Sequence, residues 1–170
     1  MNTTVAKPVT AEQVRQWLTL VPDPEIPVLS VVDLGLIRNI AWEGQVCVVT
    51  ITPTYSGCPA MDEISSDIQA ALHQNGLQDV RIQTQLAPAW TTDWMTPQGR
   101  AALKEYGIAP PQQKAIDISG ISRHADAAVV PCPHCGSKKT RLISYFGSTS
   151  CKALYRCNQC GEPFDYFKAH

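Results

Sequence analysis

The chain has 170 residues, a formal net charge of -1 and 44% hydrophobic residues. This length suffices for one domain, or for one domain plus a small module, and the composition is that of a folded, soluble protein. A net charge near zero gives no electrostatic reason to expect nucleic acid or an anionic membrane as a partner. No apolar run approaches the roughly 20 residues that a membrane-spanning helix needs, and residues 1–10 lack the apolar segment of a signal peptide. We therefore expect a cytoplasmic protein.

The first predicted helix begins after Thr10, a common N-cap residue, and runs to about Leu20. Its apolar residues have the i, i+3, i+4, i+7 spacing of one helix face. Residues 21–27 cannot continue this helix, because three prolines impose an extended conformation. Asp23 and Glu25 lie on that extended segment. Solvated turn carboxylates are the simpler interpretation of these two residues, and the segment alone leaves a functional role open.

A hairpin, a helix and a further strand follow. Strands are expected at residues 36–42 and 45–52, joined by a tight turn at Glu43-Gly44. The second of these strands is almost entirely apolar, which is typical of a strand in the middle of a sheet. Residues 59–74 have helical periodicity, and the alternation over residues 80–86 predicts a half-buried strand. The predicted fold class is α+β, a small α/β sandwich with helices packed on one sheet.

A cysteine with a candidate chemical role precedes the second helix. The chain turns and delivers Cys58 to the start of this helix, which Pro59 is expected to open, because proline is favoured at the first helical position. Unpaired N–H groups and the positive end of the helix dipole favour a thiolate there, as a nucleophile or a soft-metal ligand requires. The charges of Asp62 and Glu63 in the same turn oppose a thiolate. A buried structural cysteine is the alternative.

Trp90, Trp94 and Met95 lie close together outside any predicted strand or long helix. They either cover an edge of the sheet or form a docking surface for a partner. A short helix capped by Thr96 follows. Residues 108–128 contain two adjacent prolines, Gln, Ser and Gly, and lack periodicity, so they are predicted to form a linker.

The cysteines are concentrated in the last part of the chain, which holds five of the seven. In a reducing cytosol this pattern indicates metal binding rather than disulfides. Two C-x-x-C motifs, each followed by Gly, have the spacing of a four-cysteine structural zinc site in a zinc ribbon. Four ligands leave no open position on the metal for catalysis. The predicted zinc ligands are Cys132, Cys135, Cys157 and Cys160.

Cys151 is left over by this zinc site. It lies on a loop rich in Gly and Ser, beside Lys152. It is either a packing residue of the ribbon or a reactive or metal-passing thiol. Strands of the ribbon are expected at residues 139–146, 154–157 and 164–167.

Three motifs resemble those of the MIP18 family, also called DUF59, over roughly residues 10–90. They are Asp23-Pro24-Glu25-Ile26-Pro27, Asp33-Leu34-Gly35-Leu36-Ile37 and residues 52–59, in the family's order and at compatible spacing. The resemblance implies a role in iron–sulfur cluster assembly. It also implies that Cys58 corresponds to the cysteine of the family's Gly-Cys-Pro motif and that Asp23, Glu25 and Asp33 are its acidic motif residues.

Four segments, residues 52–59, 86–97, 146–157 and 163–168, are similar to segments of the PaaD accessory proteins of bacterial phenylacetyl-CoA epoxidase systems. In those systems a di-iron oxygenase epoxidises the ring of phenylacetyl-CoA with electrons from a reductase, and the PaaD protein is associated with metal-centre maturation. The resemblance implies the oxygenase or reductase subunits as partners, structural zinc, and iron or an iron–sulfur cluster as transient cargo. The sequence itself contains no Glu-x-x-His pair for a di-iron site and no Gly-x-Gly-x-x-Gly motif for a dinucleotide.

Three functions are compatible with these features. In the first, an assembly factor holds iron or a cluster on Cys58; one cysteine cannot hold a cluster alone, so Cys151 or a second chain in a homodimer must contribute. In the second, a binding module docks onto the oxygenase through its Trp-rich segment and its ribbon. The third, a thiol enzyme, is the weakest, because no histidine is spaced to pair with Cys58.

We adopt the assembly factor as the prediction, with no catalytic apparatus of its own. The residues predicted to serve cluster or iron transfer are Cys58, Asp23, Glu25, Asp33 and Cys151, and those predicted to bind a partner are Trp90, Trp94 and Met95. The predicted division of the chain is a MIP18-like domain at residues 1–107, a linker at 108–128 and the zinc ribbon at 129–170.

Overall fold

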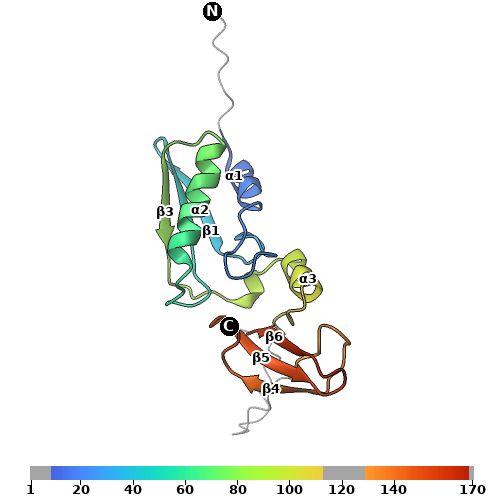
Figure 1. Ribbon diagram of the computed structural model, residues 1–170. Coiled ribbons are helices and arrows are strands. Elements are labelled where there is room, and N and C mark those ends of the chain that lie inside the picture. Colours follow the sequence, from blue (N-terminus) through green and yellow to red (C-terminus); the bar gives the residue numbers. More distant parts are fainter. Residues whose placement is uncertain (1–8, 113–128, 169–170) are drawn as a thin grey trace, which may run out of the picture.

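A computed structural model describes residues 9–112 and 129–168 of the chain (Figure 1). None of the helices in these two ranges is long and apolar enough to cross a lipid bilayer. The helices are α1 (Ala11–Leu18), α2 (Met61–Gln74), α3 (Pro97–Glu105) and the short 3-10 helix η1 (Thr92–Trp94). The strands are β1 (Ile37–Glu43), β2 (Val46–Ile51), β3 (Val80–Thr84), β4 (Thr140–Ser144), β5 (Lys152–Cys157) and β6 (Pro163–Phe167).

The first sheet has the order β1-β2-β3, with β1 and β2 antiparallel and β2 and β3 parallel. The predicted hairpin is confirmed, since Glu43 pairs with Val46 and Gly44 between them adopts a φ of 64°. β2 is the central strand, as its apolar sequence indicates. Its parallel pairing with β3 requires a crossover, which α2 provides. α1 and α2 contact each other and the sheet, so that their apolar faces and the sheet enclose the first core (Figure 1).

Two helix starts agree with their sequence signals and one does not. Thr10 caps α1 in a capping box, and Thr96 caps α3, which Pro97 opens. α2 begins at Met61, so the prediction that Pro59 opens it is wrong. The residues before α2 instead form a turn, in which the N–H of Cys58 donates to the carbonyl of Tyr55 at 3.2 Å.

The Trp-rich segment belongs to the first core. Trp90 and Met95 are buried, and the indole N–H of Trp90 donates to the carbonyl of Leu34 at 3.0 Å. Trp94 is half-buried, with the guanidinium carbon of Arg38 3.4 Å from its ring centroid. The predicted docking surface is therefore wrong for Trp90 and Met95, because neither side chain is accessible, and the alternative of core cover describes them.

The second sheet is the ribbon, with the order β4-β5-β6 and antiparallel pairing throughout. A small apolar core of its own lies on this sheet, in which the ring of Tyr155 packs against the rings of Phe164 and Tyr166. The three predicted strands are present, with β5 beginning at Lys152, earlier than expected. Figure 1 shows the ribbon packed against the end of the first unit near α3.

The ribbon is joined to the first unit by buried contacts. Phe167 and Cys151 belong to the first core rather than to the ribbon's own, and the ring centroids of Phe167 and Trp90 are 6.0 Å apart. Ala109 hydrogen-bonds along β6, donating to the carbonyl of Asp165 at 2.8 Å and accepting from the N–H of Phe167 at 3.0 Å. The first residues of the predicted linker are thus packed, and residues 113–128 of it lie outside the described residues. The predicted domain boundaries stay a prediction.

Candidate metal centre and thiol pocket

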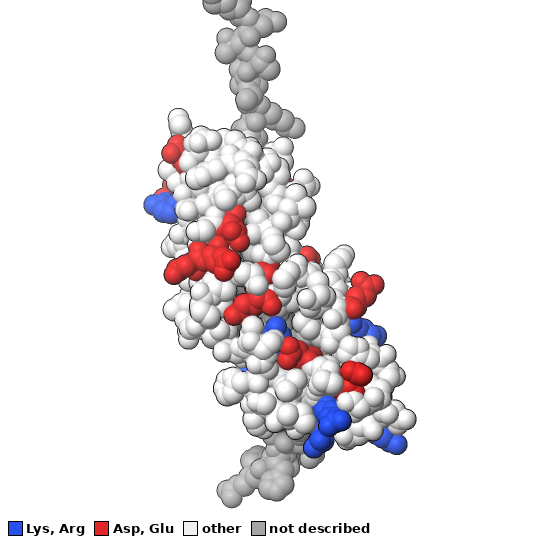
Figure 2. All heavy atoms as spheres, viewed as in Figure 1, with Lys and Arg blue, Asp and Glu red and all other residues white. Residues whose placement is uncertain are grey.

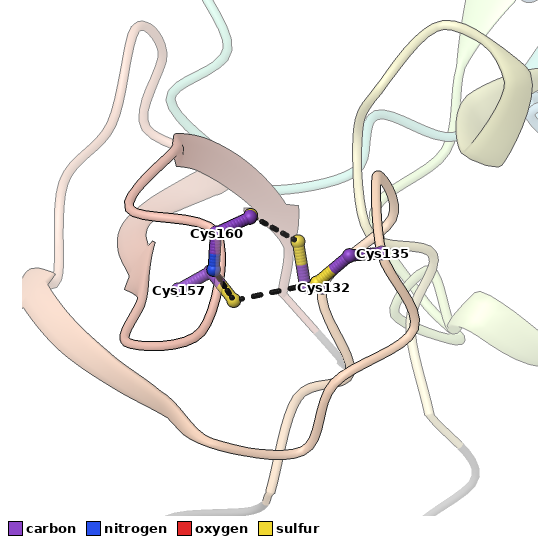
Figure 3. A group of neighbouring side chains, drawn as sticks. All are labelled: Cys132, Cys135, Cys157 and Cys160. Carbon is purple, nitrogen blue, oxygen red and sulfur yellow. Dashed lines mark hydrogen bonds between the residues drawn. The ribbon is translucent and has the colours of Figure 1, made fainter.

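The two C-x-x-C motifs bring four thiols together at one end of the ribbon (Figure 3). All four sulfur atoms lie within 4.8 Å of one another, with Sγ–Sγ separations of 3.8 Å for Cys132 and Cys160 and 3.6 Å for Cys135 and Cys157. A tetrahedral zinc ion with Zn–S bonds of about 2.3 Å requires sulfur atoms about 3.8 Å apart. The four residues therefore fit a structural zinc ion.

The backbone around these cysteines is already shaped for a metal. Each motif closes an equivalent turn, in which the N–H of the following glycine donates to the carbonyl of the first cysteine, at 2.9 Å for Gly136 and 3.0 Å for Gly161. The N–H groups of Cys160 and Gln159 point at the sulfur of Cys157, and they lower the pKa of that thiol to about 6. Donors aimed at a sulfur stabilise the thiolate, which is the form that binds zinc.

A second cluster of candidate ligands lies where the ribbon meets the first unit. The side chains of Asp23, Glu25, Cys58 and Cys151 line one small pocket. Its free volume is about 10 Å³, close to the minimum that a single water molecule needs. Three of the four side chains come from the first unit and Cys151 comes from the ribbon. Thr54 and six apolar side chains complete the wall, the latter being Ile26, Leu34, Leu36, Met61, Ile64 and Phe167.

Asp23 is fixed by its own loop. Its carboxylate accepts the N–H of Glu25 at 2.9 Å and the N–H of Ile26 at 2.8 Å, which closes a tight turn after the proline-rich segment. The residue is buried, and burial raises the pKa of Asp23, although the two N–H donors act in the opposite direction. Burial also raises the pKa of Glu25, and the neighbouring charge of Asp23 adds to this effect. The pocket therefore holds two carboxyl groups whose ionised forms are costly without a cation.

Cys58 faces these carboxyl groups rather than a free helix end. Burial raises the pKa of its thiol and the charges of Glu25 and Asp23 raise it further, while the N–H of Ala60 lowers it without outweighing them. Burial and these charges therefore oppose the thiolate that the start of the second helix was expected to favour. The opposing charges come from Asp23 and Glu25 instead of the two acidic residues that follow Cys58 in sequence.

Cys151 is buried at the start of β5, with its sulfur 4.0 Å from Oε2 of Glu25 and 3.0 Å from Oγ1 of Thr149. Burial raises the pKa of this thiol, and the charge of Glu25 contributes. The next residue, Lys152, is only 4% exposed, and its positive charge lowers the pKa of Asp23, Glu25 and Cys151. In the sequence, Lys152 is no more than a neighbour of Cys151. Its position as the buried cation of the pocket depends on how the ribbon docks.

Asp33 is the one predicted transfer residue that the structure places elsewhere. It does not line the pocket; its carboxylate accepts the hydroxyls of Ser30 at 2.7 Å and Thr96 at 2.6 Å. It thereby ties its own loop to the start of α3. Tyr55, within the motif of residues 52–59, is a neighbour of the pocket to which the sequence alone assigns no role: its hydroxyl lies near both Cys58 of the first unit and Ser150 of the ribbon.

The pocket is not closed around a metal ion in this arrangement. Within residues 9–112 and 129–168, the four ribbon cysteines are the one set of three or more His, Cys, Asp or Glu ligands whose atoms all lie within 4.8 Å of one another. The ligand atoms of the pocket would have to move closer together to share an ion.

The architecture is that of an iron–sulfur-assembly type domain followed by a zinc ribbon, and comparison with known proteins agrees. Residues 11–83 match the family model described as iron-sulfur cluster assembly protein, and residues 118–168 match the PaaD zinc beta ribbon domain. A crystal structure of a DUF59 domain from Bacillus anthracis covers 54% of this chain and 89% of its own, at 29% identity and a TM-score of 0.51.

The whole chain also has a full-length relative. It is 52% identical over 166 residues to a protein of Escherichia coli strain K12 that is named as the putative D component of 1,2-phenylacetyl-CoA epoxidase, covering 97% of this chain and 96% of the relative. A "Fe-S protein maturation auxiliary factor" of Porphyromonas gingivalis is 38% identical over 102 residues, 58% of this chain and 92% of its own. The chain belongs to the PaaD family of phenylacetyl-CoA epoxidase components.

Proposed function

We propose that this chain is a non-catalytic accessory protein of phenylacetyl-CoA epoxidase that helps to mature an iron or iron–sulfur centre in the oxygenase or reductase subunits. The names of its relatives support both parts of the proposal, the epoxidase system and the maturation of iron–sulfur proteins. The observation that carries it is the shared pocket, in which the ribbon supplies Cys151 to the side chains of Cys58, Asp23 and Glu25.

Two thiols and two carboxylates are a ligand set suited to iron. Thiolates hold iron–sulfur clusters and ferrous iron, while carboxylates bind iron and exchange readily. Ferrous iron would displace the protons of Cys58 and Cys151, since a metal ligand must be deprotonated. On transfer, the bonds from iron to these sulfurs break as ligands of the client form theirs, and the thiols regain their protons without any change in the oxidation state of iron.

The pocket also determines which cargo fits the closed form. A free volume of about 10 Å³ favours one ion over a cluster as the cargo. We therefore propose that the pocket carries a single iron ion while the ribbon is docked on the first unit, and that a cluster binds only after the two separate. The positive charge of Lys152, a buried residue near the pocket, would repel a bound cation, which favours release over tight storage.

Metal and sulfide analysis of anaerobically purified protein tests this proposal. We expect about one zinc per chain in all variants, and additional iron after reconstitution that is lost in Cys58→Ala and in Cys151→Ser. Cys47→Ala is the matched control, because it removes a buried thiol that lies outside the pocket. Equal iron in the wild type and both pocket variants, or zinc alone in all of them after reconstitution, contradicts the assignment of cargo.

A second measurement connects the pocket to the client. Epoxidase reconstituted with the Cys58→Ala chain should contain less iron and turn over phenylacetyl-CoA more slowly than enzyme reconstituted with Cys47→Ala. Normal iron loading and normal activity of the epoxidase with Cys58→Ala would exclude this role for the chain.

A further inference from the structure

The ribbon exposes a group of large apolar side chains at one edge. β4 is an outer strand of its sheet, and its register with β5 is interrupted between Leu142 and Ser144. Ile143, Tyr145 and Phe146 are 47%, 71% and 69% exposed. Exposed apolar residues that stand singly need no explanation, but three within four positions form a patch.

A groove of about 390 Å³ continues this patch along the ribbon. Its walls include Phe146, Leu154, Phe164 and Asp165. Asp165 is the acidic residue of the groove, and its carboxylate accepts the hydroxyl of Ser148 at 2.8 Å. The groove lies next to the exposed ring of Phe146.

The charge around the patch indicates what kind of partner it fits. Residues 129–168 contain six basic and two acidic residues, a net charge of +4, whereas residues 9–112 contain five basic and eleven acidic residues, a net charge of -6. The ammonium of Lys168 donates to the carbonyl of Tyr145 at 3.2 Å and lies 4.9 Å from the ring centroid of Phe146. An ammonium group has three N–H donors, and the described residues accept one of them in a printed hydrogen bond, so a carboxylate could accept another. Figure 2 shows the same division, with acidic atoms gathered over the first unit and basic atoms at the far end of the ribbon.

The patch is continuous with the loop that carries Cys151. The N–H of Gly147 donates to the carbonyl of Lys152 at 2.8 Å, so the two ends of residues 147–152 are tied together. Cys151 lies five residues beyond Phe146 and points into the thiol pocket. A partner seated on the patch would therefore contact the loop that positions one of the two candidate cargo ligands.

We propose that Ile143, Tyr145, Phe146 and Lys168 form a docking surface for an acidic segment of the client protein that carries an apolar anchor residue. The apolar anchor enters the groove beside Phe146, and the flanking carboxylates meet Lys168 and the basic ribbon. The identity of the client as an epoxidase component rests on the proposed function, while the surface itself needs no metal transfer. This surface is proposed in place of the Trp-rich segment, in which Trp90 and Met95 are buried and Trp94 is half-buried.

Binding of the full-length chain to purified epoxidase oxygenase and reductase subunits, each immobilised separately, tests the surface. We expect the double variant Tyr145→Ala, Phe146→Ala to bind one of these subunits at least about tenfold more weakly, as loss of aromatic anchors commonly does. Lys168→Glu should also weaken binding, and it should reduce the dependence of affinity on salt. Tyr106→Ala is the matched control, because Tyr106 is an exposed ring outside the ribbon and should change affinity less than twofold.

Two outcomes overturn the proposal. One is wild-type affinity of the double variant for every subunit. The other is a loss of self-association by analytical ultracentrifugation with unchanged binding to the subunits, which would assign the patch to a second copy of this chain. Iron and zinc contents of the double variant are expected to equal those of the wild type, so failure of the docking surface is distinguishable from failure of the thiol pocket.

Discussion

Replacing Phe167 by alanine should separate the two units of the protein. Phe167 comes from β6 of the ribbon, yet it is fully buried in the first core and packs edge to face against Trp90. Truncating a fully buried phenylalanine costs about 3–5 kcal/mol, of which about 0.5–1.5 kcal/mol is the ring pair with Trp90. Against a total stability of about 5–15 kcal/mol for a folded protein, this loss is large.

Urea unfolding measures the loss of stability, and thiol alkylation shows whether the junction between the two units has opened. We expect Phe167→Ala to lower the free energy of unfolding by the stated amount and to expose Cys151, which is buried in the wild type, to N-ethylmaleimide. Phe146→Ala is the matched control: the same substitution in the same ribbon removes an exposed ring and should change stability by less than about 0.5 kcal/mol. Equal unfolding midpoints for the two variants, with Cys151 equally protected, would refute the assignment of Phe167 as the link between the units.

Two further predictions concern the motifs of the first unit. Asp23→Asn keeps an oxygen that can accept the two backbone N–H groups but removes a charge whose burial raises the pKa above its usual 3.8. Because the pKa is raised in the folded state, the contribution of Asp23 to stability is lost as pH rises through that pKa. In thermal unfolding the variant should therefore be more stable than the wild type at pH 8, and this advantage should disappear towards pH 4. An advantage that does not depend on pH would contradict this. Urea unfolding should show that Gly35→Ala destabilises the protein more than Gly44→Ala. Both glycines have positive φ, which costs a residue with a Cβ about 1–2 kcal/mol. Only at Gly35 would a Cβ also lie 2.4 Å from the carbonyl oxygen of Trp94. Equal losses for the two glycine variants would show that the close approach of Trp94 is unimportant.

Local signals in the sequence predicted much of the fold. The caps at Thr10 and Thr96, the Glu43-Gly44 turn and the apolar run of β2 each depend on neighbouring residues, and the structure contains all of them. The C-x-x-C spacing is equally local within each turn, and so the four-cysteine set could be identified from sequence. The start of α2 could not be predicted in this way, because the turn before Met61 competes with the preference of Pro59 for the first helical position.

The thiol pocket could be predicted only in part. Resemblance to a family indicated Asp23, Glu25 and Cys58, but periodicity reports which face of an element is buried and not which distant element covers it. The burial of Cys151, Lys152 and Phe167 depends on the docking of the ribbon, for which no local pattern exists. The environment of Cys58 is hidden from the sequence for the same reason, since the carboxylates that raise its pKa precede it by more than thirty residues and approach it only in the fold.

The position of the pocket at the junction has a consequence for the order of folding. Glu25 and Cys151 are 126 positions apart in the sequence. The first and last predicted zinc ligands, Cys132 and Cys160, are only 28 positions apart, and the hairpin of β1 and β2 joins residues that are closer still. Contacts between distant residues require closure of a long loop, and they form after local contacts. The pocket should therefore assemble last and open first, as a local fluctuation in native-state hydrogen exchange. Under the proposed function, iron would enter and leave as the two folded units move apart, without the unfolding of either.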